Sequence, residues 1–184
     1  MKALFFAADG VEDSELFYPL YRMKEEGVET TLAAPEKGAF SGKHGYSFEA
    51  DCTFDDINAS DFDVLVLPGG SAPEKVRLSD KAISVIKQMA DSGKTIASIC
   101  HGAQSLISAD VLKGKDATCW QGIRDDIKAA GANYHDEQVV VDEKLITSRC
   151  PDDLPAFCKR LIEQTKMASG GQYQSAEGAT QKSS

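Results

Sequence analysis

The stretch TIASICHGAQSLISAD, residues 95–110, places a cysteine and a histidine at the junction between two kinds of structure. Residues 95–99 form the short apolar run typical of a buried strand, and residues 104–112 carry the apolar spacing of a helix. Small residues lie two positions before and after Cys100, a pattern that resembles the sharp strand-to-helix turn around a catalytic nucleophile. We therefore predict a strand–turn–helix corner with the Cys100 thiol at the start of the helix, where the helix dipole would lower its pKa.

The same alternation of strands and helices runs through most of the chain. Apolar runs predict strands at residues 3–7, 28–34, 62–67 and 95–99 and a pair of strands within 138–148; helical spacing predicts helices at 14–27, 80–93, 104–112, 121–131 and 152–164. This order predicts an α/β three-layer sandwich with a mostly parallel sheet covered on both faces.

The domain boundary follows from composition. We expect one domain over residues 1–166, because 184 residues are the size of a single domain. Residues 167–184 are rich in Gly, Ser and Gln and contain almost no large aliphatic side chain, so we expect a flexible low-complexity tail.

Charge and cysteine content exclude several classes of protein. The net charge of −9 argues against a nucleic-acid surface, which needs clustered Lys and Arg. The apolar run at residues 3–8 is too short for a signal peptide or a membrane span. Five cysteines, an odd number without a C-x-x-C pair, favour reduced thiols and a cytoplasmic protein.

No cofactor or metal is expected. The three histidines, His44, His101 and His135, lack metal-ligand spacing. The PGG turn at residues 68–70 lacks the G-x-G-x-x-G and Lys-Ser/Thr patterns of nucleotide-binding loops.

Polar residues fall where the predicted strands end. Glu12 follows the first strand, the Gly69–Gly70 turn and Glu74 follow a later one, and Cys100 ends the next. Because ligands bind beyond the carboxyl ends of strands in open α/β sheets, we expect these residues on one rim.

The chemistry of these residues leaves their roles open. Glu12 is either a carboxyl partner of the thiol or an acid at a helix start, where the dipole favours it. The N–H groups of Gly69 and Gly70 could stabilise an oxyanion, although a plain tight turn explains the glycines equally well. His101 could act as a general base, stabilise a thiolate, or only cap the helix.

The other cysteines have a simpler interpretation. All four lie in or beside predicted strands or on the terminal helix, where packing explains them: Cys52, Cys119, Cys150 and Cys158. A glutamine amidotransferase also uses a cysteine at such a turn, but it needs a later His-x-Glu pair that this chain lacks. We therefore reject that activity.

Six stretches in order resemble one known family, the ThiJ/PfpI superfamily, and within it the PfpI-type branch of intracellular proteases and stress proteins. They are EDSELFYPLYRMKEEG (12–27), GKHGYSFEADCTFDD (42–56), FDVLVLPGG (62–70), APEKVRLSDKAI (72–83), GKTIASICHGAQSLISADVLKGK (93–115) and EQVVVDEKLITSRCPDDLPAF (137–157). The resemblance runs from residue 1 to about residue 164.

The resemblance implies a flavodoxin-like fold of the kind seen in class I glutamine amidotransferases. It implies Cys100 as nucleophile beside His101, and Glu12 as the carboxyl hydrogen-bonded to the thiol. Backbone donors are implied at Gly70 and His101. The resemblance also implies that Glu74 reaches a neighbouring subunit in a homo-oligomer, a dimer or a hexamer.

One pocket residue departs from the family pattern. Trp120 stands where relatives often have tyrosine, which would alter the shape of the pocket.

Three functions are compatible with this resemblance. The first is a glutathione-independent glyoxalase III or protein deglycase that acts on methylglyoxal and glyoxal or on their adducts. The second is a cysteine peptidase of the PfpI type (peptidase C56). The third is a redox sensor or chaperone that uses Cys100 without turnover. We favour the carbonyl chemistry, because a small dicarbonyl needs only a tight pocket whereas a peptide needs room for an extended chain.

Overall fold

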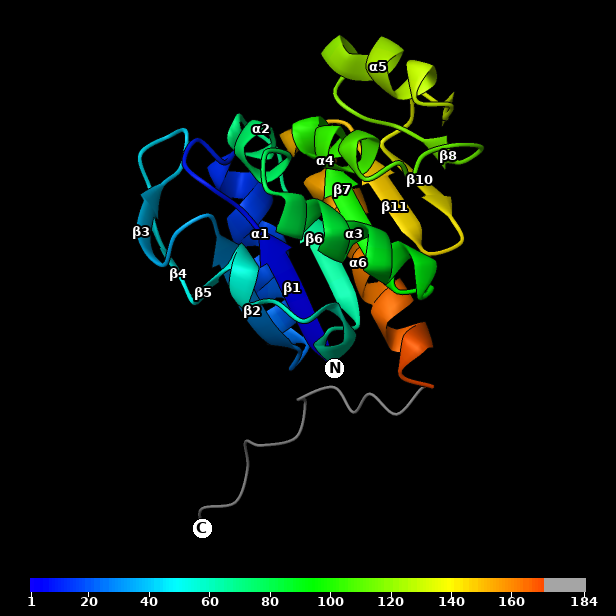
Figure 1. Ribbon diagram of the computed structural model, residues 1–184. Coiled ribbons are helices and arrows are strands. Elements are labelled where there is room, and N and C mark those ends of the chain that lie inside the picture. The colour runs from blue at the N-terminus through cyan, green and yellow to red at the C-terminus, as the bar shows by residue number, and fades with distance from the viewer. Residues whose placement is uncertain (171–184) are drawn as a thin grey trace.

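A seven-stranded sheet forms the centre of the protein (Figure 1). The computed structural model describes residues 1–170. Neighbouring strands pair in parallel, except for the antiparallel edge strand β10. In spatial order the strands are β10 (Val139–Asp142), β11 (Leu145–Ser148), β7 (Thr95–Ile99), β6 (Val64–Leu67), β1 (Lys2–Phe6), β2 (Glu29–Ala34) and β5 (Cys52–Thr53).

Helices cover both faces of this sheet, which confirms the predicted three-layer α/β sandwich (Figure 1). One face carries α1 (Asp13–Glu25) and α6 (Leu154–Ala168), and the other carries α2 (Ala72–Val76), α3 (Asp80–Asp91) and α4 (Ala103–Ser108). The short helix α5 (Arg124–Ala129) lies at the end of the sheet where the parallel strands finish (Figure 1).

Two hydrophobic cores explain why the central strands are mainly apolar on both faces. In β1, Phe5 packs under α1 and α6, whereas its neighbours Leu4 and Phe6 pack under α3. Successive side chains of a strand point to opposite faces, so a sheet covered on both faces requires continuous apolar runs. These apolar runs are what identified the strands in the sequence.

Short or exposed elements escaped the sequence analysis. A hairpin formed by β3 (Gly38–Ser41) and β4 (Ser47–Ala50) stands beside the main sheet, and β8 (Asp116–Ala117) pairs with β9 (Asn133–Tyr134). Predicted helix 121–131 is a 3₁₀ turn followed by α5.

The chain end was predicted only in part. Helix α6 extends to Ala168, beyond the expected domain boundary at residue 166. The rest of the predicted tail, from residue 171 on, lies outside the described residues.

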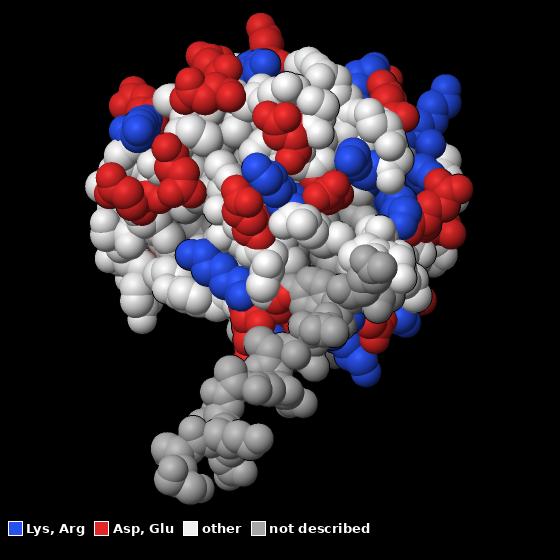
Figure 2. Space-filling model, turned by 90° about the horizontal axis from the view of Figure 1, so that it is seen from below, with Lys and Arg blue, Asp and Glu red and all other residues white. Residues whose placement is uncertain are grey.

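Acidic and basic side chains are interspersed on the face seen from below (Figure 2). Two ion pairs lie at the starts of the parallel strands: Lys94 Nζ is 3.4 Å from Asp63 Oδ1, and Lys2 Nζ is 3.4 Å from Glu29 Oε1. Within residues 1–170, no helix is long and apolar enough to cross a membrane.

The corner after β7 depends on a close backbone contact at Gly102. A Cβ atom at this position would lie 2.2 Å from the carbonyl oxygen of Leu67. We expect Gly102→Ala to destabilise the fold by roughly 2–4 kcal/mol, because neither backbone can yield without moving β6 or β7. Gly114→Ala, at a positive φ of 76° in open space, should cost only about 1 kcal/mol. Urea unfolding of the two variants measures the difference, and equal losses would contradict the proposed clash.

Candidate active site

A pocket of about 500 Å³ lies at the carboxyl ends of β1, β6 and β7. Residues from six segments line it: Glu12, Glu15, Lys43, Gly70, Ser71, Glu74, Cys100, His101, Trp120 and Pro151. The predicted rim is therefore present, and it brings together every predicted site residue except Gly69, which lies directly behind Gly70.

Cys100 lies at the strand-to-helix corner in a strained backbone conformation. Its φ is 61°, in the left-handed region that L-residues other than glycine rarely adopt. Such a conformation costs roughly 1–3 kcal/mol and persists where the surrounding structure imposes it. Residues 100–102 form a 3₁₀ turn before α4. The thiol is held at the pocket with only 8% of the residue exposed.

His101 contacts the thiol directly. Its Nδ1 lies 3.3 Å from Cys100 Sγ, a contact that consecutive helical residues could not make and that the positive φ allows. Burial and the positive charge of Lys43 lower the pKa of His101. The imidazole is therefore neutral at neutral pH and can accept the thiol proton.

The carboxyl group beside the thiol belongs to Glu15, so the expectation that Glu12 is the hydrogen-bonded partner of Cys100 is corrected. Glu15 is fully buried, and its carboxyl interacts with the Cys100 side chain. Burial raises the pKa of Glu15 to about 8, and the charge of Glu12 adds to the rise. Glu15 is therefore mostly a neutral acid at pH 7, able to donate a hydrogen bond.

The proton of this neutral acid has a defined position. Glu15 Oε2 accepts a hydrogen bond of 2.7 Å from the Gly69 N–H. The other oxygen, Oε1, is buried and has no hydrogen-bond partner among the described residues. Because Oε2 accepts from the Gly69 N–H, Oε1 is the oxygen left to carry the proton of the neutral acid.

Glu15 escaped the sequence analysis because it resembles an ordinary acid in the first turn of a helix. The spacing of Glu15 from its helical neighbours could have revealed its burial. Glu15, Pro19 and Met23 follow one another at four-residue intervals and are all buried on the sheet-facing side of α1.

Glu12 lies at the mouth of the same pocket. It precedes the first residue of α1 and lies one helical turn before Glu15. Its carboxylate lies 3.0 Å from His44 Nε2 and 3.7 Å from Lys43 Nζ, so its charged and polar partners come from the β3–β4 turn, and it lines the same pocket as Cys100.

The two glycines have different tasks. The N–H groups of Gly70 and His101 point at the Cys100 sulfur, where they lower the pKa of the thiol. The Gly69 N–H instead binds Glu15, so the expected pair of glycine donors is reduced to one. Gly69 has a steric role as well, since a Cβ there would lie 2.9 Å from Cys100 Cβ.

The resting thiol differs from the prediction. Burial raises the pKa of Cys100 to about 12, and repulsion from a charged Glu15 contributes to the rise. The expected effect of the helix N-terminus is therefore outweighed by burial. Because Glu15 is largely neutral at pH 7, its repulsion is mostly absent there. The thiol can then pass its proton to His101 as it attacks.

Glu74 and Trp120 complete the wall of the pocket. Glu74 lies on α2, and its charge acts on His101 to raise the pKa of the imidazole. The Trp120 ring lies nearly parallel to His101, with 6.2 Å between the ring centres. Both residues therefore limit what can approach the thiol from this side.

The remaining cysteines do not line this pocket. Cys119 and Cys158 are buried in the cores, and burial raises the pKa of each thiol to about 12. Cys52 and Cys150 are partly exposed, and burial raises their pKa values too.

One group of side chains has the spacing of metal ligands. Glu12, Asp13 and His44 offer ligand atoms within 4.8 Å of one another. Both Asp13 oxygens accept backbone N–H groups, from His44 and Tyr46, and Lys43 places a positive charge beside Glu12. Protein donors thus already occupy these oxygens.

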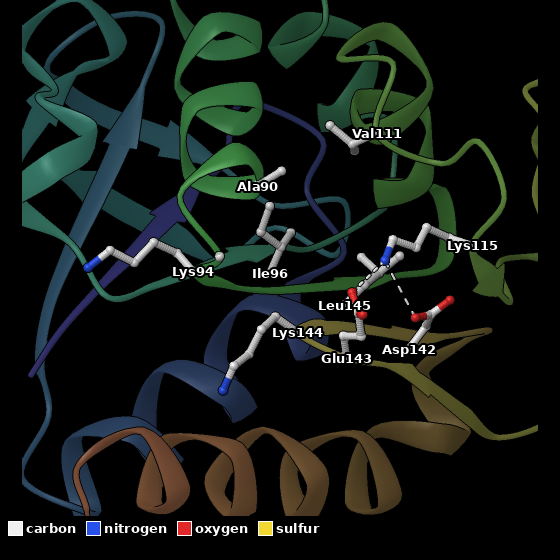
Figure 3. Close-up of a pocket in the computed structure, with 10 residues that line it drawn as sticks. Ala90, Lys94, Ile96, Val111, Lys115, Asp142, Glu143, Lys144 and Leu145 are labelled. Atoms are coloured by element: carbon white, nitrogen blue, oxygen red, sulfur yellow. Dashed lines mark hydrogen bonds and ion pairs between the residues drawn. The ribbon is translucent and has the colours of Figure 1, made fainter.

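A second pocket, of about 110 Å³, lies at the opposite end of β7 and β11 (Figure 3). Ile96 and Leu145 contribute apolar walls, and Lys115 forms ion pairs with Asp142 and Glu143 at 3.5 and 2.8 Å. No cysteine or histidine lines it, so it offers no nucleophile comparable to Cys100.

Comparisons with known proteins agree with this fold. The model of the DJ-1/PfpI family matches residues 1–164. "Deglycase PfpI" of Pyrococcus furiosus is 51% identical over 166 residues, which are 90% of this chain and 100% of that protein. "Putative cysteine protease YraA" of Bacillus subtilis is 40% identical over 90% of this chain and 98% of its own length.

A solved structure from Anabaena variabilis extends the comparison. It is a two-domain protein with DJ-1/ThiJ/PfpI-like and ferritin-like domains, superposed with a TM-score of 0.88 at 36% identity. The match covers 98% of this chain and 52% of that one. A cysteine corner at the rim of a mostly parallel α/β sandwich thus defines the class, and this chain belongs to the DJ-1/PfpI family.

The buried acid Glu15 makes stability depend on pH. Because its pKa is raised from 4.5 to about 8, the cost of ionising it in the folded protein grows as pH rises above 4.5 and is complete above 8. Glu15→Gln cannot ionise, so above pH 8 we expect it to exceed the wild type in free energy of unfolding by roughly 3–5 kcal/mol. At pH 4–5 the two proteins should differ little.

Denaturant unfolding at several pH values measures this difference, with the exposed Glu36→Gln as control. A constant offset between Glu15→Gln and the wild type across the whole range would show that Glu15 titrates normally.

Proposed function

We propose that this protein is a cysteine enzyme that acts on reactive carbonyls, converting methylglyoxal or glyoxal, free or as adducts on other molecules, into hydroxy acids. The observation that carries the proposal is the surroundings of the Cys100 sulfur. A neutral base, a neutral acid and two backbone N–H groups all converge on it, from His101, Glu15 and Gly70. The name of the Pyrococcus furiosus relative, a deglycase, supports the same class of activity.

The chemistry with methylglyoxal needs no oxidant and no glutathione. The Cys100 sulfur forms a bond to the aldehyde carbon as its proton passes to His101, and the carbonyl oxygen then takes this proton from His101 to become the hydroxyl of a hemithioacetal. The proton on that carbon then moves to the neighbouring ketone carbon through an enediol, which leaves a lactoyl thioester. Water cleaves the thioester to lactate and restores the thiol.

Each neighbour of the sulfur has a place in this sequence. The N–H groups of Gly70 and His101 stabilise negative charge that develops beside the sulfur. His101 is a neutral base that can accept a proton, and Glu15 is a neutral acid that can donate one. Two groups whose environments separate their pKa values in this way are suited to carry a proton from one substrate carbon to the next.

Adducts fit the same sequence. An aminocarbinol or hemithioacetal on another molecule still carries a carbon at the aldehyde level next to a ketone. Release of the amine or thiol regenerates the aldehyde for Cys100. Direct action on the adduct and removal of the released aldehyde therefore share all later steps.

Removal of the nucleophile tests the proposal. Cys100→Ala should lose lactate formation from methylglyoxal by at least about a hundredfold without glutathione, because no other group can form the thioester. Cys52→Ser, which changes a partly exposed thiol outside the pocket, should keep wild-type rates. Equal rates for Cys100→Ala and the wild type would refute carbonyl chemistry at this thiol.

Peptidase activity is the second candidate, favoured by the name of the Bacillus subtilis relative. Under this function Glu74 would complete the site of a neighbouring subunit in a dimer or hexamer. Fluorogenic peptides should then be cleaved by the oligomer and spared by Glu74→Ala. Cleavage by both proteins, or by neither, would count against a shared site.

A sensor without turnover would instead show two oxygens added to Cys100 after mild peroxide and no lactate.

A further inference from the structure

A second acid–base pair lies at the mouth of the pocket. His44 Nε2 is 3.0 Å from Glu12 Oε1 and 3.2 Å from Oε2. Only 11% of the Glu12 side chain is exposed, whereas 58% of the His44 side chain is exposed. The pair therefore joins a sheltered carboxylate in the pocket to an imidazole in contact with bulk water.

The backbone holds this pair in place. Asp13 accepts the His44 N–H at 2.7 Å and the Tyr46 N–H at 3.2 Å. On the other side of the turn, the Lys43 N–H donates to Val11 O at 2.8 Å. The turn between β3 and β4 is thus fixed to the start of α1, and His44 meets Glu12 without a change in the loop.

Hydrolysis of the thioester requires a base for the attacking water. Glu15 is a neutral acid bound to the Gly69 N–H, and Lys43 is a cation, so the candidate bases in the pocket are His101, Glu74 and Glu12. Of these, Glu12 is the one paired with an imidazole that is open to solvent, which gives the proton a route out of the pocket.

We propose that Glu12 activates the water that releases the product from Cys100, and that His44 carries the resulting proton from Glu12 to bulk solvent. This inference rests on the proposed carbonyl chemistry and assigns the hydrolytic step within it. Glu12 is the catalytic group here, and His44 is a relay that acts through it.

The step balances without a further reactant. The water oxygen forms a bond to the thioester carbon, and one water proton moves to the Glu12 carboxylate. The tetrahedral oxyanion then re-forms its carbonyl, the carbon–sulfur bond breaks, and its electron pair returns to Cys100 as thiolate. Glu12 passes its proton to bulk water through His44, and the thiolate takes up the acid proton of the product to restore the thiol.

Substitution of His44 tests the relay. In His44→Ala, kcat for lactate formation should fall roughly 10- to 100-fold and KM should fall with it, so that kcat/KM changes little, since hydrolysis slows while addition to Cys100 proceeds. The acyl-enzyme should then accumulate, visible by intact mass after rapid quenching as one added methylglyoxal. Hydroxylamine should trap it as lactohydroxamate, which distinguishes the thioester from the hemithioacetal of equal mass.

Free imidazole supplies a readout that a purely structural defect would not show. It should restore part of kcat in His44→Ala, because the site of the missing ring is open to solvent. It should not restore kcat in Glu12→Gln. His135→Ala is the matched control, since His135 Nε2 pairs with Asp116 Oδ1 at 3.1 Å outside the pocket. It should keep wild-type kcat and show no response to imidazole.

Each other outcome contradicts the relay. Wild-type kcat in both His44→Ala and His44→Gln would overturn it. A fall in kcat with no accumulated thioester and no rescue by imidazole would also overturn it, when the midpoint of thermal unfolding is unchanged. Failure of the proposed function is a separate result: the wild type itself would then form no lactate. That result would refute the relay as well.

Discussion

The buried hydrogen bond from the Gly69 N–H to Glu15 Oε2 joins the parts of this site. Glu15 comes from the first turn of α1, Gly69 from the loop after β6, and both touch Cys100 after β7. A carboxyl group can lie in such an apolar place only if it is neutral or well paired. The single N–H partner leaves one oxygen for the proton, and so burial itself favours the neutral acid form of Glu15 in contact with Cys100.

Two glutamates one helical turn apart therefore do different chemistry. Glu15 is enclosed between α1 and the sheet, where burial favours its neutral form. Glu12 lies at the pocket mouth, where its neighbours are Lys43 and His44. The separation resembles the division between a proton donor and a proton acceptor in other acid–base sites. It arises from position, because Glu15 lies inside α1 against the sheet, whereas Glu12 precedes the helix at the pocket mouth.

The sequence predicted the elements of this protein better than it predicted their contacts. Continuous apolar runs in β1, β6 and β7 identified the parallel sheet, and the rule for strand ends placed Cys100, Gly70 and Glu74 on one rim. The β3–β4 hairpin went unrecognised because its strands are short and half exposed, and with it the position of His44. The carboxyl partner of Cys100 was expected to be Glu12, as the family resemblance implied, and Glu15 was not considered, although its spacing on α1 could have revealed its burial.

The protonation state of Glu15 is the most direct test of this description of the site. Carbon-13 NMR of protein labelled at the glutamate carboxyl carbons would follow it, with the signal assigned by its loss in Glu15→Gln. We predict a titration midpoint near pH 8, well above the ordinary value of 4.5. A midpoint near 4.5 would mean that a carboxylate faces the sulfur at neutral pH, and the neutral acid on which the proposed chemistry depends would not exist.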